Sequence, residues 1–303
     1  MSSKKSKVVI IGANGYVGRN MSYYLNNEGY EIINFDVQIK TEHKWMEYYK
    51  LDILDKKSLE LIPKDSDFIF VFSGITGTYE GFDKYKDFIE VNEIGLLNIL
   101  DYVRNSEIHA RIIFPSTRLV YSGVRGKALT EEMEKNPKTI YAINKLTCEN
   151  ILKVYSETFG IKYNVFRICV PYGNLIGNDY SYGTIGFFLN QALNSRKITL
   201  FGDGELRRTF TNIEDLCNLF KKTIEIKESE NQVYNIGGED LSLKEVAQKI
   251  SDKFPNTVIE YTPWSEKSLI IESGDTIFDS CKLDNLVNHK YKHYFGNWLN
   301  NNF

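Results

Sequence analysis

The start of the sequence holds the arrangement that most restricts the fold, a short apolar run followed by a glycine-rich turn and a helical pattern. The apolar run covers Lys7–Ile11 and is typical of a buried strand in a parallel sheet. Gly12, Gly15 and Gly18 follow it, and the helical pattern covers Tyr16–Asn27. This order indicates a dinucleotide-binding unit, in which glycines permit a sharp turn, close approach of a pyrophosphate and tight helix packing. The alternative interpretation is a glycine-rich turn that binds no ligand.

An acidic residue follows the second predicted strand. This strand covers Glu31–Phe35, and Asp36 comes directly after it. A carboxylate at about this distance from the glycine turn binds the ribose hydroxyls of NAD. It would also repel the 2′-phosphate of NADP, so the sequence favours NAD as the cofactor. The alternative is a strand-end aspartate that only caps a loop.

Apolar runs and helical patterns alternate along the chain, which predicts an α/β fold with a doubly wound parallel sheet. Further strands are predicted at Tyr48–Leu51, Phe68–Phe72, Arg111–Phe114, Lys162–Arg167, Lys197–Phe201 and Arg208–Thr211, and helices at Gly81–Asn105, Tyr141–Phe159, Ile213–Ile226 and Leu243–Phe254. Ligands of such sheets bind beyond the carboxyl ends of the strands. Five residues are predicted at that edge, namely Gly12, Asp36, Asp52, Ser73 and Thr117. Their convergence indicates a functional site.

A tyrosine and a lysine four residues apart lie at the start of one predicted helix. Tyr141 and Lys145 share one face of that helix. An ammonium close to a phenol favours the phenolate, and a tyrosine placed in this way takes a proton from an alcohol near neutral pH. The alternative interpretation is two surface residues of an amphipathic helix, which is the usual meaning of this spacing.

The composition argues against several classes of protein. The chain has 303 residues and a formal net charge of −3, which gives no reason to expect nucleic acid binding. No apolar run approaches the length of a membrane span. The 4 cysteines and 4 histidines are scattered. We therefore expect a cytoplasmic protein with neither a disulfide framework nor a metal site.

Together the motifs resemble those of the extended short-chain dehydrogenase/reductase family, in its NAD-dependent epimerase/dehydratase branch, whose members modify nucleotide-activated sugars. The resemblance covers nearly the whole chain, in order and at family spacing. Its pieces are the glycine turn, Asp36, Asp52-Ile53, Ser116 to Tyr121, Tyr141 with Lys145, Arg167 with Pro171-Tyr172-Gly173, Gly202-Asp203-Gly204 with Arg208 and Asp215, and Tyr234 to Gly238.

The resemblance implies a role for each residue at the predicted edge. Thr117 hydrogen-bonds the reacting sugar hydroxyl, Tyr141 is the acid/base, and Lys145 holds the nicotinamide ribose and favours the Tyr141 phenolate. Asn92 supports this network, the alternative being a helix residue exposed to solvent. The residues implied to bind NAD are Gly12, Asn14, Gly15, Tyr16, Val17, Gly18, Asp36, Asp52, Ile53, Ser73, Gly74, Asn92, Tyr141 and Lys145.

The same resemblance implies a substrate site. Its residues are Thr76, Ser116, Thr117, Arg207 and Arg208. Arg208 would contact a substrate diphosphate, since a planar guanidinium suits a phosphate, and Arg207 would share or replace that role. The alternative is that these arginines are charges at the edge of a strand.

The sequence departs from the family pattern in three places. Arg118-Leu119 follows Thr117 where the 4,6-dehydratases of the family carry Asp-Glu, so we expect no dehydration. Val170 stands where many members have an Asn that contacts the nucleotide sugar, and Glu272 where many have an Arg for the diphosphate. These two departures weaken the nucleotide-sugar assignment and point toward an unusual substrate.

The resemblance also implies the domain organisation and the activity. Residues 1–168, with a return segment at about 209–238, form the NAD-binding Rossmann domain, and residues 169–208 and 239–303 form a smaller C-terminal substrate-binding domain. We expect an NAD-dependent epimerase of a nucleotide-activated sugar that forms a homodimer through its two long helices. The alternatives are an NAD(P)H-dependent nucleotide 4-keto-6-deoxy-sugar reductase and a non-catalytic dinucleotide-sensing protein. Such sensing proteins commonly lose the tyrosine or the lysine that this chain keeps.

Overall fold

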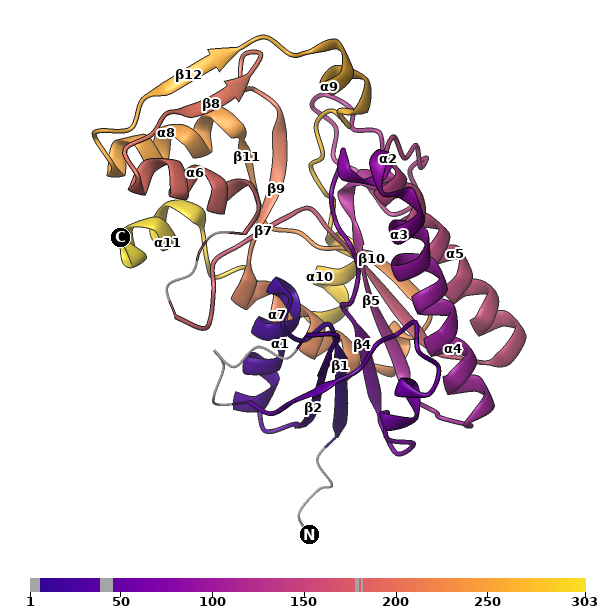
Figure 1. Ribbon diagram of the computed structural model, residues 1–303. Coiled ribbons are helices and arrows are strands. Elements are labelled where there is room, and N and C mark those ends of the chain that lie inside the picture. Colours follow the sequence, from indigo (N-terminus) through magenta and orange to yellow (C-terminus); the bar gives the residue numbers. More distant parts are fainter. Residues whose placement is uncertain (1–5, 39–45, 178–179, 181) are drawn as a thin grey trace. The chain divides into compact units, whose positions relative to one another are not determined.

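The computed structural model describes residues 6–38, 46–177, 180 and 182–303 (Figure 1). These residues form two compact units. The first unit contains the described residues of Met1–Val120, Thr139–Arg167 and Lys221–Tyr234. The second contains those of Tyr121–Lys138, Ile168–Phe220 and Asn235–Phe303. Because the chain crosses between the units several times, each unit is built from segments far apart in the sequence.

A seven-stranded sheet forms the centre of the first unit, with the strand order β10-β6-β5-β4-β1-β2-β3 (Figure 1). The strands are β1 (Lys7–Ile11), β2 (Glu31–Asp36), β3 (Tyr48–Lys50), β4 (Phe68–Val71), β5 (Arg111–Thr117), β6 (Tyr163–Ile168) and β10 (Gln232–Asn235). The neighbouring strands from β3 through β2, β1 and β4 to β5 are all paired in parallel. The predicted α/β class with a doubly wound parallel sheet is confirmed.

The strand β1 is buried on both of its faces. Val8, Val9, Ile10 and Ile11 are at most 1% exposed, and successive side chains of a strand point to opposite faces. Val9 and Ile11 pack in a core cluster with apolar residues of α4 (Gly95–Asn105) and α5 (Ile140–Phe159). The helix α1 (Tyr16–Asn27) packs against β1 and β2, and α4 and α5 run beside each other (Figure 1). Burial on both faces explains why β1 is continuously apolar.

The predicted helix at Gly81–Asn105 is interrupted in the structure. It consists of α2 (Glu80–Asp83), α3 (Tyr85–Ile89), a π-helical turn η2 (Glu90–Ile94) and α4. A π turn adds one residue to a helical turn, which a period of 3.6 residues in the sequence does not reveal. The first unit also has the short 3₁₀ turns η1 (Ser58–Leu61), η3 (Arg118–Val120) and η4 (Lys227–Ser229).

The second unit contains two smaller sheets and several helices. One sheet has the order β11-β9-β7, in which β9 pairs with β11 antiparallel and with β7 parallel, and the other pairs β8 with β12 in parallel. The strands are β7 (Val170–Tyr172), β8 (Ile198–Phe201), β9 (Arg207–Asn212), β11 (Glu239–Ser242) and β12 (Ile259–Thr262). The helices are α6 (Gly183–Leu193), α8 (Leu243–Lys253), α9 (Glu266–Ile271), α10 (Cys281–Val287) and α11 (Phe295–Asn302), and α7 (Ile213–Ile224) passes from the second unit into the first.

The strand order of the large sheet reverses beside β1. This first strand lies between β2 and β4, with Ile11 opposite Phe35 on one side and opposite Val71 on the other. In an open parallel sheet, such a reversal leaves a crevice beyond the carboxyl ends of the two strands, where ligands bind. The turn after β1 and the turn after β4 therefore border the expected ligand site.

Candidate active site

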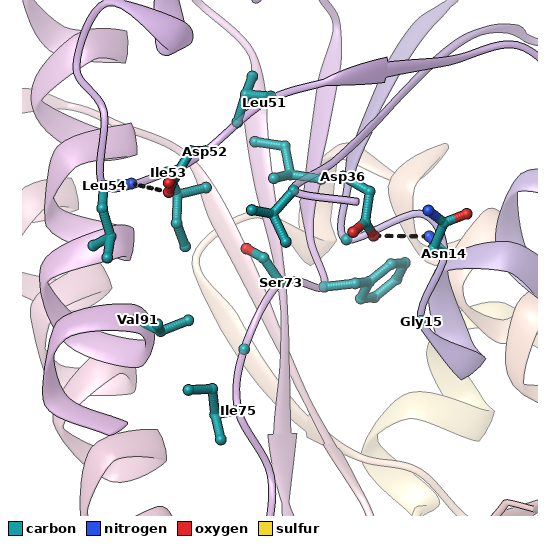
Figure 2. Close-up of a pocket in the computed structure, with 15 residues that line it drawn as sticks. Asn14, Gly15, Asp36, Leu51, Asp52, Ile53, Leu54, Ser73, Ile75 and Val91 are labelled. Carbon is teal, nitrogen blue, oxygen red and sulfur yellow. Dashed lines mark hydrogen bonds between the residues drawn. The ribbon is translucent and has the colours of Figure 1, made fainter. Parts of the chain in front are cut away.

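A cavity of about 470 Å³ opens at this reversal point of the sheet. It is lined by Ile11, Gly12, Asn14, Gly15, Asp36, Val37, Leu51, Asp52, Ile53, Leu54, Phe72, Ser73, Gly74, Ile75 and Val91. These residues come from the ends of β1 and β2, from the segments that follow β1, β2, β3 and β4, and, for Val91, from η2. Figure 2 labels ten of them around the cavity. The structure thus brings together eight of the residues predicted to bind the cofactor, namely Gly12, Asn14, Gly15, Asp36, Asp52, Ile53, Ser73 and Gly74.

The glycine turn after β1 leaves no room for side chains. Gly12 has a φ of +87°, and a Cβ atom there would lie 2.4 Å from the backbone nitrogen of Ser73. A Cβ atom on Gly18 would lie 2.2 Å from the carbonyl oxygen of Gly12. Helix α1 begins at Tyr16 after Gly15, with no side-chain cap and no acidic residue in its first turn. Its first N–H groups and its positive dipole end therefore suit a phosphate at this turn, and Val17 lies in the same first turn.

The carboxylate of Asp36 lies on the wall of the cavity. Its Oδ2 accepts the backbone N–H of Asn14 at 2.9 Å (Figure 2). Its Oδ1 accepts the backbone N–H of Gln38 at 3.1 Å. Each carboxylate oxygen accepts more than one hydrogen bond, so both keep capacity for the two hydroxyls of a ribose. Together with the uncapped start of α1, this arrangement fits a dinucleotide whose ribose lacks a 2′-phosphate.

The segment after β3 gives the cavity a largely apolar wall. Leu51, Ile53 and Leu54 line it beside Asp52, whose Oδ1 accepts the N–H of Leu54 at 2.9 Å (Figure 2). Apolar walls with a few fixed polar groups are typical of pockets that bind an aromatic base. The cavity wall beside Asp52 and Ile53 therefore suits an aromatic base.

The π turn η2 places Asn92 against the loop that follows β4. The Asn92 Oδ1 atom accepts the N–H of Ile75 at 2.8 Å, and its Nδ2 donates to the carbonyl oxygen of Ile75 at 3.0 Å. Asn92 is only 5% exposed, so its alternative as a solvent-exposed helix residue is wrong. It positions Ser73, Gly74 and the loop after them through this two-point contact.

Lys145 is buried at the start of α5, beside the end of β5. Its Nζ donates to the carbonyl oxygen of Pro115 at 2.8 Å and lies 4.3 Å from the centre of the Phe114 ring. The same Nζ is 5.9 Å from the centre of the Tyr141 ring, and a Cβ atom on Gly74 would lie 4.0 Å from it. The ammonium therefore stands between Tyr141 and the wall of the cavity. Burial lowers the pKa of Lys145 to about 8.

This burial gives a prediction about stability. Because the native state binds this proton less tightly than the unfolded chain, stability rises as the pH increases from about 8 toward 10.5. In nucleotide-free protein, we expect the unfolding free energy relative to the Lys145→Met variant to rise by about 3 kcal/mol across this window. Urea unfolding at a series of pH values measures this difference. Lys153→Met, which removes an exposed lysine from α5, is the control, and a difference independent of pH would contradict the prediction.

The strand β5 extends beyond the predicted Arg111–Phe114 and includes Ser116 and Thr117. Thr117 is 8% exposed, and its Oγ1 accepts the N–H of Leu119 at 3.3 Å. The helix α5, which carries Tyr141, packs against β5 and against the η3 turn that follows Thr117. The Ser116 hydroxyl is instead buried and donates to Glu149 at 2.5 Å. Of the other residues predicted to bind substrate, Thr76 is exposed on the loop after β4.

The remaining two predicted substrate residues, Arg207 and Arg208, lie on β9 in the second unit. Arg208 is 3% exposed, and its guanidinium pairs with Glu272 at 2.6 Å and donates to the carbonyl oxygens of Gly274 and Arg207. Arg207 pairs with Asp240 at 3.0 Å and with Glu245 at 3.2 Å. Both arginines therefore have acidic partners within the chain. Glu272 also lines a cavity of about 230 Å³ together with Ser122, Gly123, Lys138, Leu206, Trp264, Leu269, Ser273 and Gly274.

Sequence reasoning missed one buried cluster in the first unit. Glu149 accepts hydrogen bonds from Ser116 and from Arg167, and all three residues are at most 6% exposed. One signal was available, because Glu149 lies four residues after Lys145 and so shares its face of α5. The contact of Lys145 with Phe114 was missed as well.

Comparison with known proteins decides the family. The profile described as the NAD dependent epimerase/dehydratase family matches residues 8–237. The chain belongs to this family. It is 25% identical over 254 residues to a putative UDP-glucose 4-epimerase of Methanocaldococcus jannaschii, covering 79% of each chain. It is 28% identical over 262 residues to a UDP-N-acetyl-alpha-D-glucosaminuronate decarboxylase of Bacillus cytotoxicus, covering 81% of this chain and 79% of the relative.

A solved structure supports the same fold for this family member. The crystal structure of the UDP-glucose 4-epimerase of Thermus thermophilus in complex with NAD superposes with a TM-score of 0.83 at 21% identity, covering 96% of this chain and 95% of the other. Among the described residues, no group of three or more metal-binding side chains lies together. In the described part of the chain, each helix is also too short or too polar to cross a membrane.

Proposed function

We propose that this family member is an NAD-dependent epimerase of a nucleotide-activated sugar. One observation carries the proposal: the buried ammonium of Lys145 lies 5.9 Å from the centre of the Tyr141 ring and beside Gly74, on the wall of the cavity that suits NAD. A phenol, an ammonium and a dinucleotide site in one place are the parts that reversible oxidation of an alcohol requires. The names of the relatives, which include a putative UDP-glucose 4-epimerase, support the nucleotide-sugar class.

The proposed reaction assigns a separate task to each residue. When bound, NAD supplies a reversible two-electron oxidant, which Gly12, Gly15 and Asp36 would hold through its phosphates and ribose. The Tyr141 phenolate, which the Lys145 ammonium favours, takes the proton of the sugar hydroxyl, and the phenol that results later returns it. The reaction consumes no net oxidant, because the hydride given up by the sugar carbon would return to the opposite face of that carbon after the keto-sugar has turned, and Tyr141 returns the proton to the same oxygen.

The residues after Thr117 favour epimerisation over loss of water. Removing water from a sugar requires an additional acid and base next to the reacting carbon, whereas Arg118 and Leu119 occupy these positions here. A diphosphate would also have to compete with Glu272 for Arg208.

Incubation of the purified protein with a panel of nucleotide sugars tests the proposal. We expect an epimer to accumulate without added cofactor, and NAD to be released when the protein is denatured by heat. A requirement for stoichiometric NADH or NADPH with a 4-keto-6-deoxy sugar would favour the reductase instead. The absence of any product, with NAD bound, would contradict both and favour the dinucleotide-sensing protein.

A further inference from the structure

A buried carboxylate connects three elements of the first unit beneath the predicted catalytic residues. Glu149 Oε1 accepts the Ser116 hydroxyl at 2.5 Å and the Arg167 Nε at 3.0 Å, and Glu149 Oε2 accepts the Arg167 Nη2 at 2.5 Å. The side chains of Glu149 and Arg167 are each 5% exposed. Three charge-assisted hydrogen bonds to one carboxylate fix its position strongly.

Each partner lies on an element that borders the catalytic residues. Ser116 is the neighbour of Thr117 on β5, and Arg167 lies on β6, which is adjacent to β5 in the sheet. Glu149 lies four residues after Lys145 on α5, so both side chains project from one face of the helix. The carboxylate therefore joins the end of the strand carrying Thr117 to the helix that carries Tyr141 and Lys145.

The charge of the cluster also acts on Lys145. Burial disfavours the ammonium of Lys145, and negative charge on Cys148 and on Glu149 opposes this effect by favouring the charged form. Because burial raises the pKa of the Cys148 thiol to about 12, the negative charge between pH 8 and 10.5 comes from Glu149. A buried ion pair contributes little net stability, since apolar residues of the same volume often serve as well. Stability alone therefore gives no reason for a carboxylate at this position.

We propose that Glu149 is a positioning residue for the proton transfer, setting the placement of Thr117 relative to Tyr141 and keeping the Lys145 amine charged. This inference rests on the proposed function, because it concerns the same tyrosine and lysine. Ser116 transmits the placement to Thr117, and Arg167 holds the carboxylate in place by donating to both of its oxygens.

The variant Glu149→Gln tests the proposal because it keeps the shape and one acceptor oxygen but removes the charge. We expect kcat to fall by about 10- to 100-fold with little change in KM, and the alkaline limb of the pH profile to move down by about one pH unit. A second readout needs no substrate. The lower end of the pH window in which stability rises relative to a matched Lys145→Met background should move downward by a similar amount, whereas its upper end, set by the unfolded chain, should stay in place.

A second ion pair on β5, partly buried, offers a control. Arg111 begins this strand, and its Nη2 pairs with Glu230 at 3.0 Å. Glu230→Gln should reduce stability but leave both kcat and the pH profile unchanged. Equal effects of the two variants, or a Glu149→Gln enzyme with the kcat and the pH window of wild type, would overturn the proposal.

A third variant keeps the test decisive if Glu149→Gln does not fold. Ser116→Ala retains the Glu149–Arg167 pair and removes only the connection to β5. It should lower kcat several-fold without moving the pH window, and an unchanged kcat would overturn the positioning role. If no sugar is turned over by wild type, the proposed function fails, whereas the pH window of stability still tests the effect of Glu149 on Lys145.

Discussion

Tyr141→Phe is expected to lower kcat by about 10³-fold, with the amount of bound NAD unchanged. The substitution removes one hydroxyl and keeps the ring that lies 5.9 Å from the Lys145 ammonium, so the packing at the start of α5 is preserved. General acid–base catalysis by a positioned side chain contributes about 10²- to 10⁴-fold. Tyr141 is the one group that we propose as the acceptor of the sugar hydroxyl proton. Steady-state assays with the nucleotide sugar that wild type turns over fastest measure this loss.

Tyr155→Phe is the matched control for this experiment. Tyr155 lies on the same helix and packs against Phe159 at a ring distance of 5.3 Å, so the control removes a hydroxyl from α5 outside the proposed site. We expect its kcat to equal that of wild type. A Tyr141→Phe enzyme that keeps more than a tenth of the activity would refute the acid/base role. Intact cellular function in that variant would favour the dinucleotide-sensing alternative.

The first unit shows which parts of a fold can be predicted from local sequence. The strand at Lys7–Ile11 and the helix at Tyr16–Asn27 were predicted with the bounds that the structure has, because the glycines between them mark both ends of the turn. The strand β5 was predicted to end at Phe114, directly before Pro115, which lacks an N–H group to donate. It continues to Thr117 because β4 pairs with it only as far as Ile113, so Pro115 leaves no bond to β4 unmade.

The parts that were not predicted depend on residues far apart in the sequence. The strand β11 exists because Glu239–Ser242 pairs with β9, and no local pattern marks it. The pair of Arg208 and Glu272 joins residues 64 positions apart. The position of Gly12, Asp36 and Ser73 at one edge was predictable because all parallel strands end on the same side of the sheet. A side-chain contact such as that of Ser116 with Glu149 depends on how α5 packs against β5, and local sequence does not reveal it.

Gly12→Ala is expected to destabilise the protein by about 3–5 kcal/mol and to abolish the binding of NAD. A Cβ atom at Gly12 would lie 2.4 Å from the Ser73 nitrogen and 2.6 Å from the carbonyl carbon of Phe72. Both are backbone atoms in the turn after β4, whose N–H groups bond to Ile11, so relief would require β1 and β4 to separate. Overpacking of this kind costs about 1–3 kcal/mol or more, in addition to about 1–2 kcal/mol for a positive φ.

Gly160→Ala separates these two contributions. Gly160 caps α5 with a φ of +71°, and a Cβ atom there would have no neighbour within 4 Å. The Gly160→Ala variant therefore has the strain of a positive φ alone. We expect the substitution to destabilise the protein by about 1–2 kcal/mol and to leave NAD bound. Urea unfolding and the NAD released on denaturation measure both effects. Equal losses of stability in the two variants would contradict this explanation. They would mean that the positive φ, and not the close approach of β1 and β4, requires glycine at position 12.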